Sequence, residues 1–166
     1  MTSTKPTLYL ETSVPSYFAA RPSADVIVAG HQLLTRDWWE SRISDYEVFV
    51  SELVLEEAER GDREAAEKRC SAIAQFGMLR VTTEALDLAK VYLKRLPLPS
   101  TAEADAVHLA LASISGMDYL LTWNCRHIAR GSIIRSVPIV NGEFGYESPT
   151  ICTPEELLYE DPGKMD

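Results

Sequence analysis

Short apolar runs alternate with longer stretches of helical spacing along the chain. Four apolar runs predict strands: residues 7–10, 47–50, 79–82 and 118–123. Apolar residues spaced three and four apart predict helices over five stretches: 24–41, 53–60, 63–76, 83–94 and 102–115. Because strands alternating with helices favour parallel pairing, we predict an α/β fold, a three-layer α/β/α sandwich with a mostly parallel sheet.

Capping residues and breakers mark the ends of several elements. Ser100–Glu103 fits a capping box at the start of the helix over 102–115, which should end at Gly116. Thr153 and Pro154 predict the start of a last helix. Residues 138–140 and 150–152 predict one more edge strand. We expect a single domain over residues 1–166, with a core at about 7–158 and a tail at 159–166.

Composition and cysteine usage narrow the class of protein. The 166 residues are 46% hydrophobic and 25% charged, which is typical of a globular domain and excludes disordered and collagen-like chains. No apolar run approaches the roughly 20 residues that span a bilayer, and Lys5 is followed by no apolar core of a signal peptide. Three widely spaced cysteines without a CxxC motif predict reduced thiols and a cytoplasmic location.

The charge is acidic overall but contains a basic strip. A net charge of −9 argues against non-specific coating of nucleic acid, which needs clustered lysine and arginine. No acidic residue lies between Asp118 and Glu143, and the basic side chains there, which we name the basic strip, are Arg126, His127, Arg130 and Arg135. Such a strip can steer a polyanion. The acidic segment after Glu143 either extends freely or folds over the strip.

Four polar residues occupy positions that this fold class brings toward one edge of the sheet. Glu11 directly follows the first strand, and Asn124 follows the strand over 118–123. Helix geometry places Glu57 on an apolar face, where a satisfied buried glutamate is the alternative. Asp105 lies near the inward face of its helix, where it could equally serve the helix dipole. His108, three residues later, is most simply a core or boundary histidine.

Carboxylates gathered at one edge would need a cation. Glu11, Glu57 and Asp105 would repel one another unless a positive charge neutralised them, and all-oxygen ligands suit Mg²⁺ or Mn²⁺. Such an ion would polarise a phosphodiester and lower the pKa of an attacking water. The three arginines of the basic strip would hold flanking phosphates, or would simply face solvent.

The residues at these positions resemble the PIN domain family, in particular the VapC-type toxin ribonucleases of prokaryotic toxin–antitoxin pairs. The segments that resemble it are 8–13, 50–57, 104–112, 119–124 and 150–158. The resemblance implies metal-dependent cleavage of RNA, a homodimer, and a small antitoxin that covers the site. It implies catalytic and metal-binding roles for Glu11, Glu57, Asp105 and Asn124, with Ser13 and Thr122 as hydroxyl neighbours of the metal or substrate.

Two residues depart from the family pattern. Glu11 stands where the family usually has aspartate, and Asn124 stands where it usually has a carboxylate. Since an amide adds no charge and cannot act as a base, we expect one ion held mainly by Glu11 and Asp105, supported by Glu57 and Asn124. The alternative is a catalytically weak or inactive PIN-like domain that binds RNA or protein.

Other functions fit the sequence less well. A receiver domain would have an acidic pair after the first strand and a late lysine, and a haloacid-dehalogenase phosphatase would have Asp-x-Asp there; neither motif is present. Cys125 and His127 could form a nucleophilic pair, although a small buried cysteine is the simpler interpretation. Trp38 and Trp39 could stack on RNA, but packing or a dimer contact is favoured.

Overall fold

The computed structural model describes residues 5–161 and contains one five-stranded sheet. The strands follow the order β3-β2-β1-β4-β5, and every neighbouring pair is parallel. Their bounds are β1 Thr7–Leu10, β2 Glu47–Ser51, β3 Gly77–Leu79, β4 Tyr119–Leu121 and β5 Thr150–Cys152. Both outer strands have three residues. The carboxyl ends of all five strands therefore point to the same edge of the sheet.

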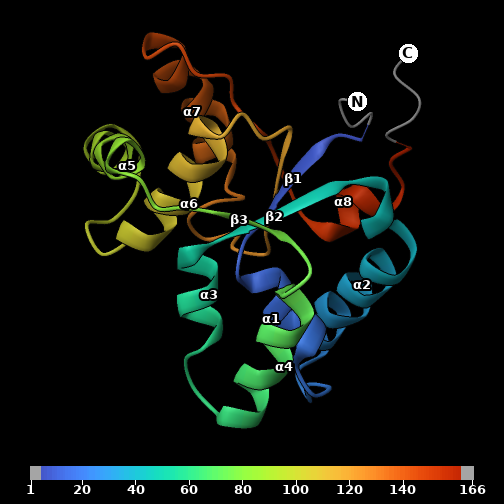
Figure 1. Cartoon of the computed structure of the whole chain (residues 1–166). Helices are drawn as coiled ribbons and strands as arrows, with labels where there is room; N and C mark the ends of the chain where they lie inside the picture. The colour runs from blue at the N-terminus through green and yellow to red at the C-terminus, as the bar shows by residue number, and fades with distance from the viewer. Residues whose placement is uncertain (1–4, 162–166) are drawn as a thin grey trace.

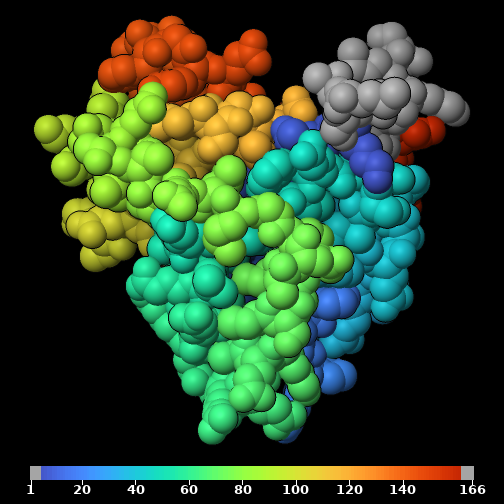
Figure 2. Space-filling view, in the orientation of Figure 1, coloured from blue at the N-terminus to red at the C-terminus, as the bar shows by residue number. Residues whose placement is uncertain are grey.

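Helices cover both faces of this sheet. They are α1 Ser13–Ala19, α2 Val26–Arg42, the 3-10 turn η1 Ile43–Asp45, α3 Glu52–Ala58, α4 Arg63–Ile73, α5 Thr83–Arg95, α6 Glu103–Ile114, α7 Gly131–Glu143 and α8 Pro154–Leu158. On one side α5 packs on α6 and α7, and on the other α2 packs on α8 and α1 (Figure 1). Figure 2 shows α3 and α4 at the narrow lower end of the molecule. The predicted three-layer α/β/α sandwich is confirmed.

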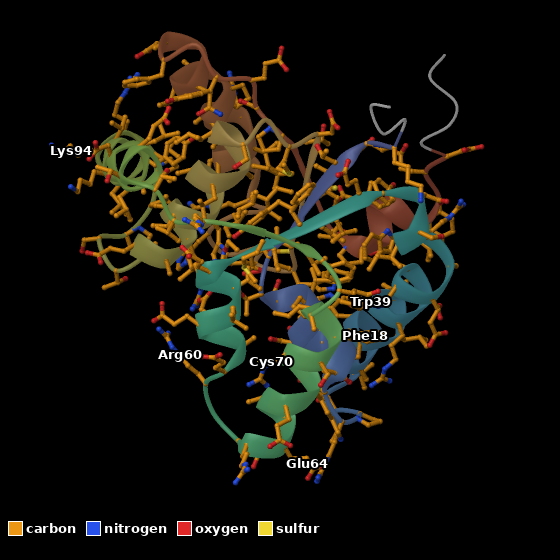
Figure 3. All side chains as sticks on the ribbon, in the orientation of Figure 1. Phe18, Trp39, Arg60, Glu64, Cys70 and Lys94 are labelled. Atoms are coloured by element: carbon orange, nitrogen blue, oxygen red, sulfur yellow. The ribbon has the colours of Figure 1, made fainter. Side chains whose placement is uncertain are left out.

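The core is densest around the central strand. Leu8, Tyr9 and Leu10 of β1 are fully buried, as expected for a strand covered on both faces. Trp39 stacks on Phe18 with ring centroids 4.1 Å apart, and the two side chains lie side by side between α1 and α2 (Figure 3). Trp38 is fully buried and Trp39 is 7% exposed, so the two tryptophans pack in the core and present no RNA-stacking surface. No helix within residues 5–161 is both long and apolar enough to cross a membrane.

Helix α1 begins shortly after β1, in a segment where the sequence analysis placed no element. The segment 11–15 is polar and contains Pro15, a residue that often breaks helices. Pro15 instead lies in the first turn of α1, where the backbone N–H that proline lacks has no partner inside the helix. The helix therefore begins at Ser13, directly beside the carboxyl end of β1.

The predicted edge strand at residues 138–140 is wrong, because these residues belong to α7. The buried side chains of α7 include Ile133, Val137 and Val140, whose spacing of four and three is helical. Pro138 is exposed on the other side of the helix. The β-branched residues and the proline at 138–140 favour a strand locally, but the burial of residues at helical spacing favours the helix. The second part of the prediction, residues 150–152, is confirmed as β5.

Two other local predictions need correction. The helix after Ser100 has Ala102 as its N-cap, without a side-chain cap, so the predicted capping box is wrong. A turn closed by the Ala102 N–H and the Pro99 carbonyl, 3.0 Å apart, takes its place. The strand predicted at 79–82 lies at 77–79, where Gly77 pairs with Phe49 of β2.

The start of the last helix is confirmed. The Glu156 carboxylate accepts hydrogen bonds from the backbone N–H of Thr153 at 2.6 Å and from its hydroxyl at 3.1 Å. The predicted tail at 159–166 is described only as far as Asp161, and residues 162–166 lie outside the described residues.

Candidate functional site

Glu11 lies at the carboxyl end of β1, and all the hydrogen bonds that hold its side chain go to one of its two carboxylate oxygens. Only 5% of the residue is exposed. Its Oε2 accepts hydrogen bonds from the Ser13 N–H at 2.8 Å, from the Ser13 hydroxyl, and from the Thr122 hydroxyl at 3.1 Å. Among residues 5–161 nothing donates to its Oε1. The second carboxylate oxygen is thus available to a ligand.

Hydroxyl groups tie the end of β4 to this carboxylate. The Ser13 hydroxyl accepts a hydrogen bond from the Trp123 N–H at 2.8 Å. The Thr122 hydroxyl accepts one from the Asn124 N–H at 2.9 Å. The two predicted hydroxyl neighbours therefore position Glu11 and the backbone that follows β4. They do so because parallel strands β1 and β4 pair directly.

Asp105, in the first turn of α6, contacts the loop that follows β4. Its Oδ1 accepts a hydrogen bond from the Asn124 amide nitrogen at 3.0 Å, and its Oδ2 lies 2.8 Å from Nδ1 of His127. The Asn124 Oδ1 accepts the His127 backbone N–H at 3.0 Å, which fixes the orientation of the amide. Asn124 is thus a positioning residue for Asp105 in this structure.

Glu57, on α3, is held by side chains from two other elements. Its Oε1 accepts a hydrogen bond from the Thr12 hydroxyl at 2.8 Å and lies 2.6 Å from Nε2 of His108 on α6. The Glu57 side chain is 24% exposed, whereas that of His108 is 1% exposed. The inward placement of Glu57 and the burial of His108 agree with the sequence analysis, which did not foresee their contact.

A buried chain of hydrogen bonds continues behind His108. Its Nδ1 lies 2.6 Å from the Tyr9 hydroxyl, which lies 2.9 Å from the Ser51 hydroxyl, and Ser51 accepts the Val54 N–H. If the ring proton of His108 is on Nε2, the Ser51 hydroxyl donates to Tyr9, the Tyr9 hydroxyl donates to Nδ1 of His108, and Nε2 donates to Glu57. With a proton on Nδ1, the Ser51 hydroxyl would have no acceptor among the described residues. The geometry therefore selects the Nε2–H tautomer.

Burial and hydrogen bonding act in opposite directions on Glu57. Partial burial alone would raise the pKa of Glu57, but the hydrogen bonds from His108 and Thr12, aided by nearby Arg60, hold this pKa below its ordinary value. Burial raises the pKa of Tyr9 far above the usual range for a phenol. The Glu57 carboxylate is therefore stabilised in its ionised form by the donors that face it.

These contacts bring Glu11, Glu57, Asp105 and Asn124 to one edge of the sheet, and we name these four residues the acidic edge. Thr12, the residue after Glu11, contacts Glu57; Thr122, which contacts Glu11, is two residues from Asn124, which contacts Asp105. The described residues contain no group of three His, Cys, Asp or Glu side chains placed to share one metal ion. Mg²⁺ is usually held by one or two carboxylates and several waters, so the oxygen ligands here fit a hydrated hard cation.

The three arginines of the basic strip are exposed and have no acidic partner within residues 5–161, whereas His127 pairs with Asp105. Arg126 and Arg135 make no ion pair or side-chain hydrogen bond within residues 5–161, and Arg130 donates only to the Pro97 carbonyl at 3.4 Å. By contrast, Arg95 pairs with Glu143. In the described part of the chain no hydrogen bond or ion pair joins these three arginines to Glu11, Glu57 or Asp105. Arg126, in the loop after β4, and Arg135, in α7, are therefore unpaired cations among the described residues.

The nucleophilic pair considered for Cys125 is not formed. Cys125 is exposed, and partial burial of its sulfur raises the pKa of the thiol, which disfavours the thiolate. His127 directs its Nδ1 at Asp105 instead. Sequence reasoning did not find Thr12, Tyr9, Ser51 or the contact of His127. Only the spacing of Asp105 and His108, three apart on one helix, could have indicated part of this network.

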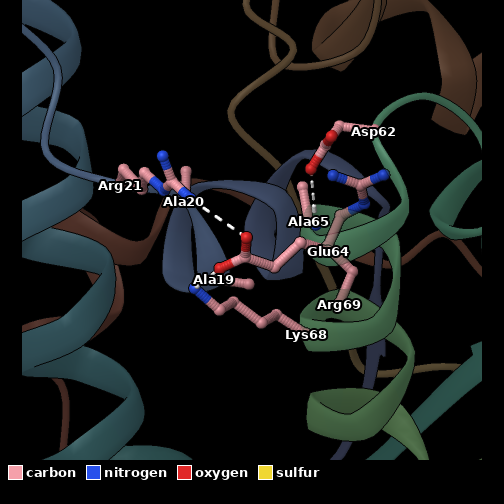
Figure 4. Close-up of a pocket in the computed structure, with 8 residues that line it drawn as sticks. All are labelled: Ala19, Ala20, Arg21, Asp62, Glu64, Ala65, Lys68 and Arg69. Atoms are coloured by element: carbon pink, nitrogen blue, oxygen red, sulfur yellow. Dashed lines mark hydrogen bonds and ion pairs between the residues drawn. The ribbon is translucent and has the colours of Figure 1, made fainter.

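A cavity of about 290 Å³ lies elsewhere, between the end of α1 and α4. Figure 4 shows Arg21 and Lys68 both reaching Glu64 there, at 3.1 and 3.2 Å. No residue of the acidic edge lines it. The cavity is therefore separate from the candidate site.

Comparison with known proteins supports the fold. No family model matches the sequence, and no curated protein matches it. Among solved structures, the chain is similar to VapC20 of Mycobacterium tuberculosis, a toxin that cleaves the sarcin-ricin loop, with a TM-score of 0.59 and 18% identity over 76% of this chain and 96% of that one. The chain thus has a PIN-like α/β fold.

Proposed function

We propose that this protein is a Mg²⁺- or Mn²⁺-dependent endoribonuclease that hydrolyses RNA phosphodiester bonds. The observation that supports it best is the placement of Glu11, Glu57 and Asp105 at the carboxyl edge of the sheet, each held by neighbouring side chains. The free arginines of the basic strip suit flanking phosphates. The similarity to a VapC toxin makes RNA the first substrate to test.

Each residue has a distinct part in this proposal. Glu11 and Asp105 would hold the ion, with Glu57 and Asn124 in direct or water-mediated support. The ion, when bound, supplies positive charge for the phosphodiester and lowers the pKa of a water. Nothing in the described chain donates to Glu57 Oε2, so this ionised oxygen is free to accept a proton from the attacking water. Arg126, Arg130 and Arg135 would bind the phosphates beside the cleaved bond.

The biological setting is part of the same proposal. We infer a toxin of a type II toxin–antitoxin module, working as a homodimer whose cognate antitoxin covers the acidic edge. This setting rests on the similarity to VapC20 and on the family resemblance of the segments around the site. Co-expression with the reading frame next to its gene, followed by co-purification, tests the antitoxin.

One observation favours a second candidate, a PIN-like domain that binds RNA or protein without cutting. The amide of Asn124 has both polar atoms engaged by Asp105 and His127, and it adds no charge to the site. Cation binding would be weaker than with a carboxylate there.

Metal binding and cleavage separate the two candidates. Mn²⁺ should raise the melting temperature of the wild type more than that of Asp105→Asn, while the exposed-carboxylate control Glu67→Gln should respond like wild type. Labelled total RNA should be cleaved by wild type and by Glu67→Gln but not by Glu57→Gln. Equal Mn²⁺-induced shifts of the melting temperature in wild type, Asp105→Asn and Glu67→Gln would refute the metal site. Metal binding and RNA binding without cleavage would favour the second candidate.

A further inference from the structure

Three aromatic side chains form a cluster beside the acidic edge, on the α1 and α2 side of the sheet. The imidazole of His31, on α2, stacks on the indole of Trp123, with ring centroids 4.1 Å apart and planes 11° from parallel. The Tyr17 ring, on α1, meets both edge-on, at 6.0 Å from His31 and 6.4 Å from Trp123. We name Tyr17, His31 and Trp123 the aromatic cluster.

The cluster is fixed in place by buried hydrogen bonds. The Trp123 indole N–H donates to the Thr35 hydroxyl at 2.7 Å, and this hydroxyl donates to the His31 carbonyl at 2.6 Å. Thr35 is fully buried. One hydroxyl thus links the two stacked residues. A stack held in this way needs no reordering when a ligand arrives, which favours binding.

His31 has binding capacity that the described chain does not use. Trp123 is only 8% exposed, whereas His31 is half-buried, so His31 is the outer ring of the stack. Neither ring nitrogen of His31 makes a hydrogen bond within residues 5–161. A flat, partly exposed ring with free nitrogens can stack on a nucleobase and also hydrogen-bond to it.

The backbone links this cluster directly to the candidate site. Trp123 lies between Thr122, which contacts Glu11, and Asn124, which contacts Asp105. The Trp123 N–H also donates to the Ser13 hydroxyl. A phosphate bound at the acidic edge would therefore bring the nucleotides that flank it next to the stack.

We propose that His31, backed by Trp123, is a stacking subsite for an unpaired nucleobase of single-stranded RNA. The proposal rests on the proposed function, because the acidic edge must first hold the RNA backbone. Unpaired bases can swing out and stack on protein rings, whereas a duplex keeps its bases stacked inside. Single-stranded RNA should therefore bind better than duplex RNA of the same length.

Affinity measurements on the full chain test the subsite directly. A ten-nucleotide single-stranded RNA and the matching duplex, both made with non-hydrolysable linkages, are titrated in Mn²⁺ against wild type, His31→Ala, His31→Phe and Leu33→Ala. Leu33 is 60% exposed on the same helix and serves as the control. His31→Ala should weaken single-strand binding on the order of ten-fold, and Leu33→Ala should not change it. His31→Phe, which keeps a flat ring, should stay within about two-fold of wild type.

Histidine ring resonances provide a measurement that needs no variant to fold. The chain has three histidines, so the ring signals of His31 can be resolved from those of His108 and His127. Adding the single-stranded RNA should shift the His31 signals by ring currents from the stacked base, and the duplex should not.

The outcomes separate this proposal from the proposed function. If wild type binds and cleaves RNA while His31→Ala matches it and the His31 signals stay unmoved, the stacking subsite is refuted and the nuclease stands. If His31→Phe binds as weakly as His31→Ala, stacking is refuted. If wild type neither binds nor cleaves RNA, both proposals fail.

Discussion

Glu57 depends on residues from two other elements for its position. Thr12 precedes α1, and His108 belongs to α6, so the carboxylate of α3 is set by contacts across the edge of the sheet. His108 is in turn held by Tyr9 of the central strand. A side chain fixed from several directions keeps one rotamer, which a proton acceptor requires.

Replacing His108 should reduce cleavage more than it reduces folding. His108→Ala leaves Glu57 and the Tyr9 hydroxyl without their shared partner, so we expect a loss of about 1–3 kcal/mol in the free energy of unfolding. We expect cleavage to fall about 10- to 100-fold, as for other residues that orient a ligand of a metal. Urea unfolding and the cleavage rate of a labelled RNA measure the two effects. His108→Gln, which can still donate to Glu57, should recover part of the activity; a wild-type rate in His108→Ala would show that the contact does not position Glu57.

The free energy of unfolding should depend on the ionisation of Glu57. Its pKa in the folded chain lies below the ordinary value of 4.5, so the folded state binds this proton less tightly than the unfolded chain does. The stabilisation is present above about pH 4.5 and is lost as the pH falls through the folded-state pKa. Urea unfolding in EDTA between about pH 6 and 3 should show a shallower acid loss for Glu57→Gln than for wild type. Glu67→Gln, at an exposed carboxylate, should keep the wild-type slope, and an unchanged slope in Glu57→Gln would contradict the assignment.

At the scale of the elements, strand β3 pairs with β2 through a close approach of the Gly77 backbone to the Phe49 side chain. Gly77 pairs with Phe49, and a Cβ built on Gly77 would lie 2.6 and 2.7 Å from two atoms of the Phe49 ring. Real side chains do not come so close, so any residue larger than glycine must displace the ring or the strand.

Two glycine-to-alanine changes should therefore have opposite effects. Gly77→Ala should lower the free energy of unfolding by about 1–3 kcal/mol through this overlap. Gly30→Ala, inside α2 with no atom within 4 Å of the new Cβ, should raise it by about 0.5–1 kcal/mol because alanine favours a helix. Urea unfolding of both variants measures the difference. Equal effects of the two changes would mean that the Phe49 ring moves aside freely.

Elements with a strong pattern were predicted from the sequence, and those with competing signals were not. The apolar run of β1 and the spacing of α2 and α5 located these elements to within a few residues. Helix α1 was missed because it is short and begins at a polar, proline-containing segment. Helix α7 was missed because Pro138 and the β-branched residues after it suggested a strand, although the buried residues have helical spacing. Local propensity is a weak guide where tertiary packing decides.

The sequence pattern selected the four candidate residues but not the side chains that position them. Glu11 and Asn124 were selected because they directly follow predicted strands, and Glu57 and Asp105 because of their places on helix faces. The hydrogen bonds of Thr12 and His108 join residues 45 and 51 positions from Glu57 in the chain. Contacts at such separations depend on strand order and helix packing, which a single sequence does not specify.

At the scale of the whole molecule, the acidic chain carries an exposed group of basic side chains, the arginines of the basic strip. The chain has a net charge of −9, yet Arg126 and Arg135 have no acidic partner within residues 5–161. The body should repel RNA, and the strip should attract it locally. The protein would therefore bind RNA in one orientation and with a strong dependence on salt.

Removing arginines of the strip should weaken this salt dependence. Arg126→Ala and Arg135→Ala should each lower RNA affinity and reduce the slope of log K against log salt by about 1, because each removes one phosphate contact. Arg63→Ala, which removes an exposed arginine paired with Glu67, is the control and should leave the slope unchanged. Binding isotherms at several salt concentrations give the slopes. A wild-type slope in both strip variants would show that these arginines only face solvent.

The three-residue length of β3 and β5 limits how this molecule can aggregate. At about 3.3 Å per residue, each border of the sheet offers only roughly 10 Å of open backbone ladder to another chain. An incoming strand would form only a few hydrogen bonds with so short an edge, and its pairing register would not be fixed. Concentrated solutions of the folded protein should therefore resist amyloid-like growth, and self-association should proceed through helical surfaces.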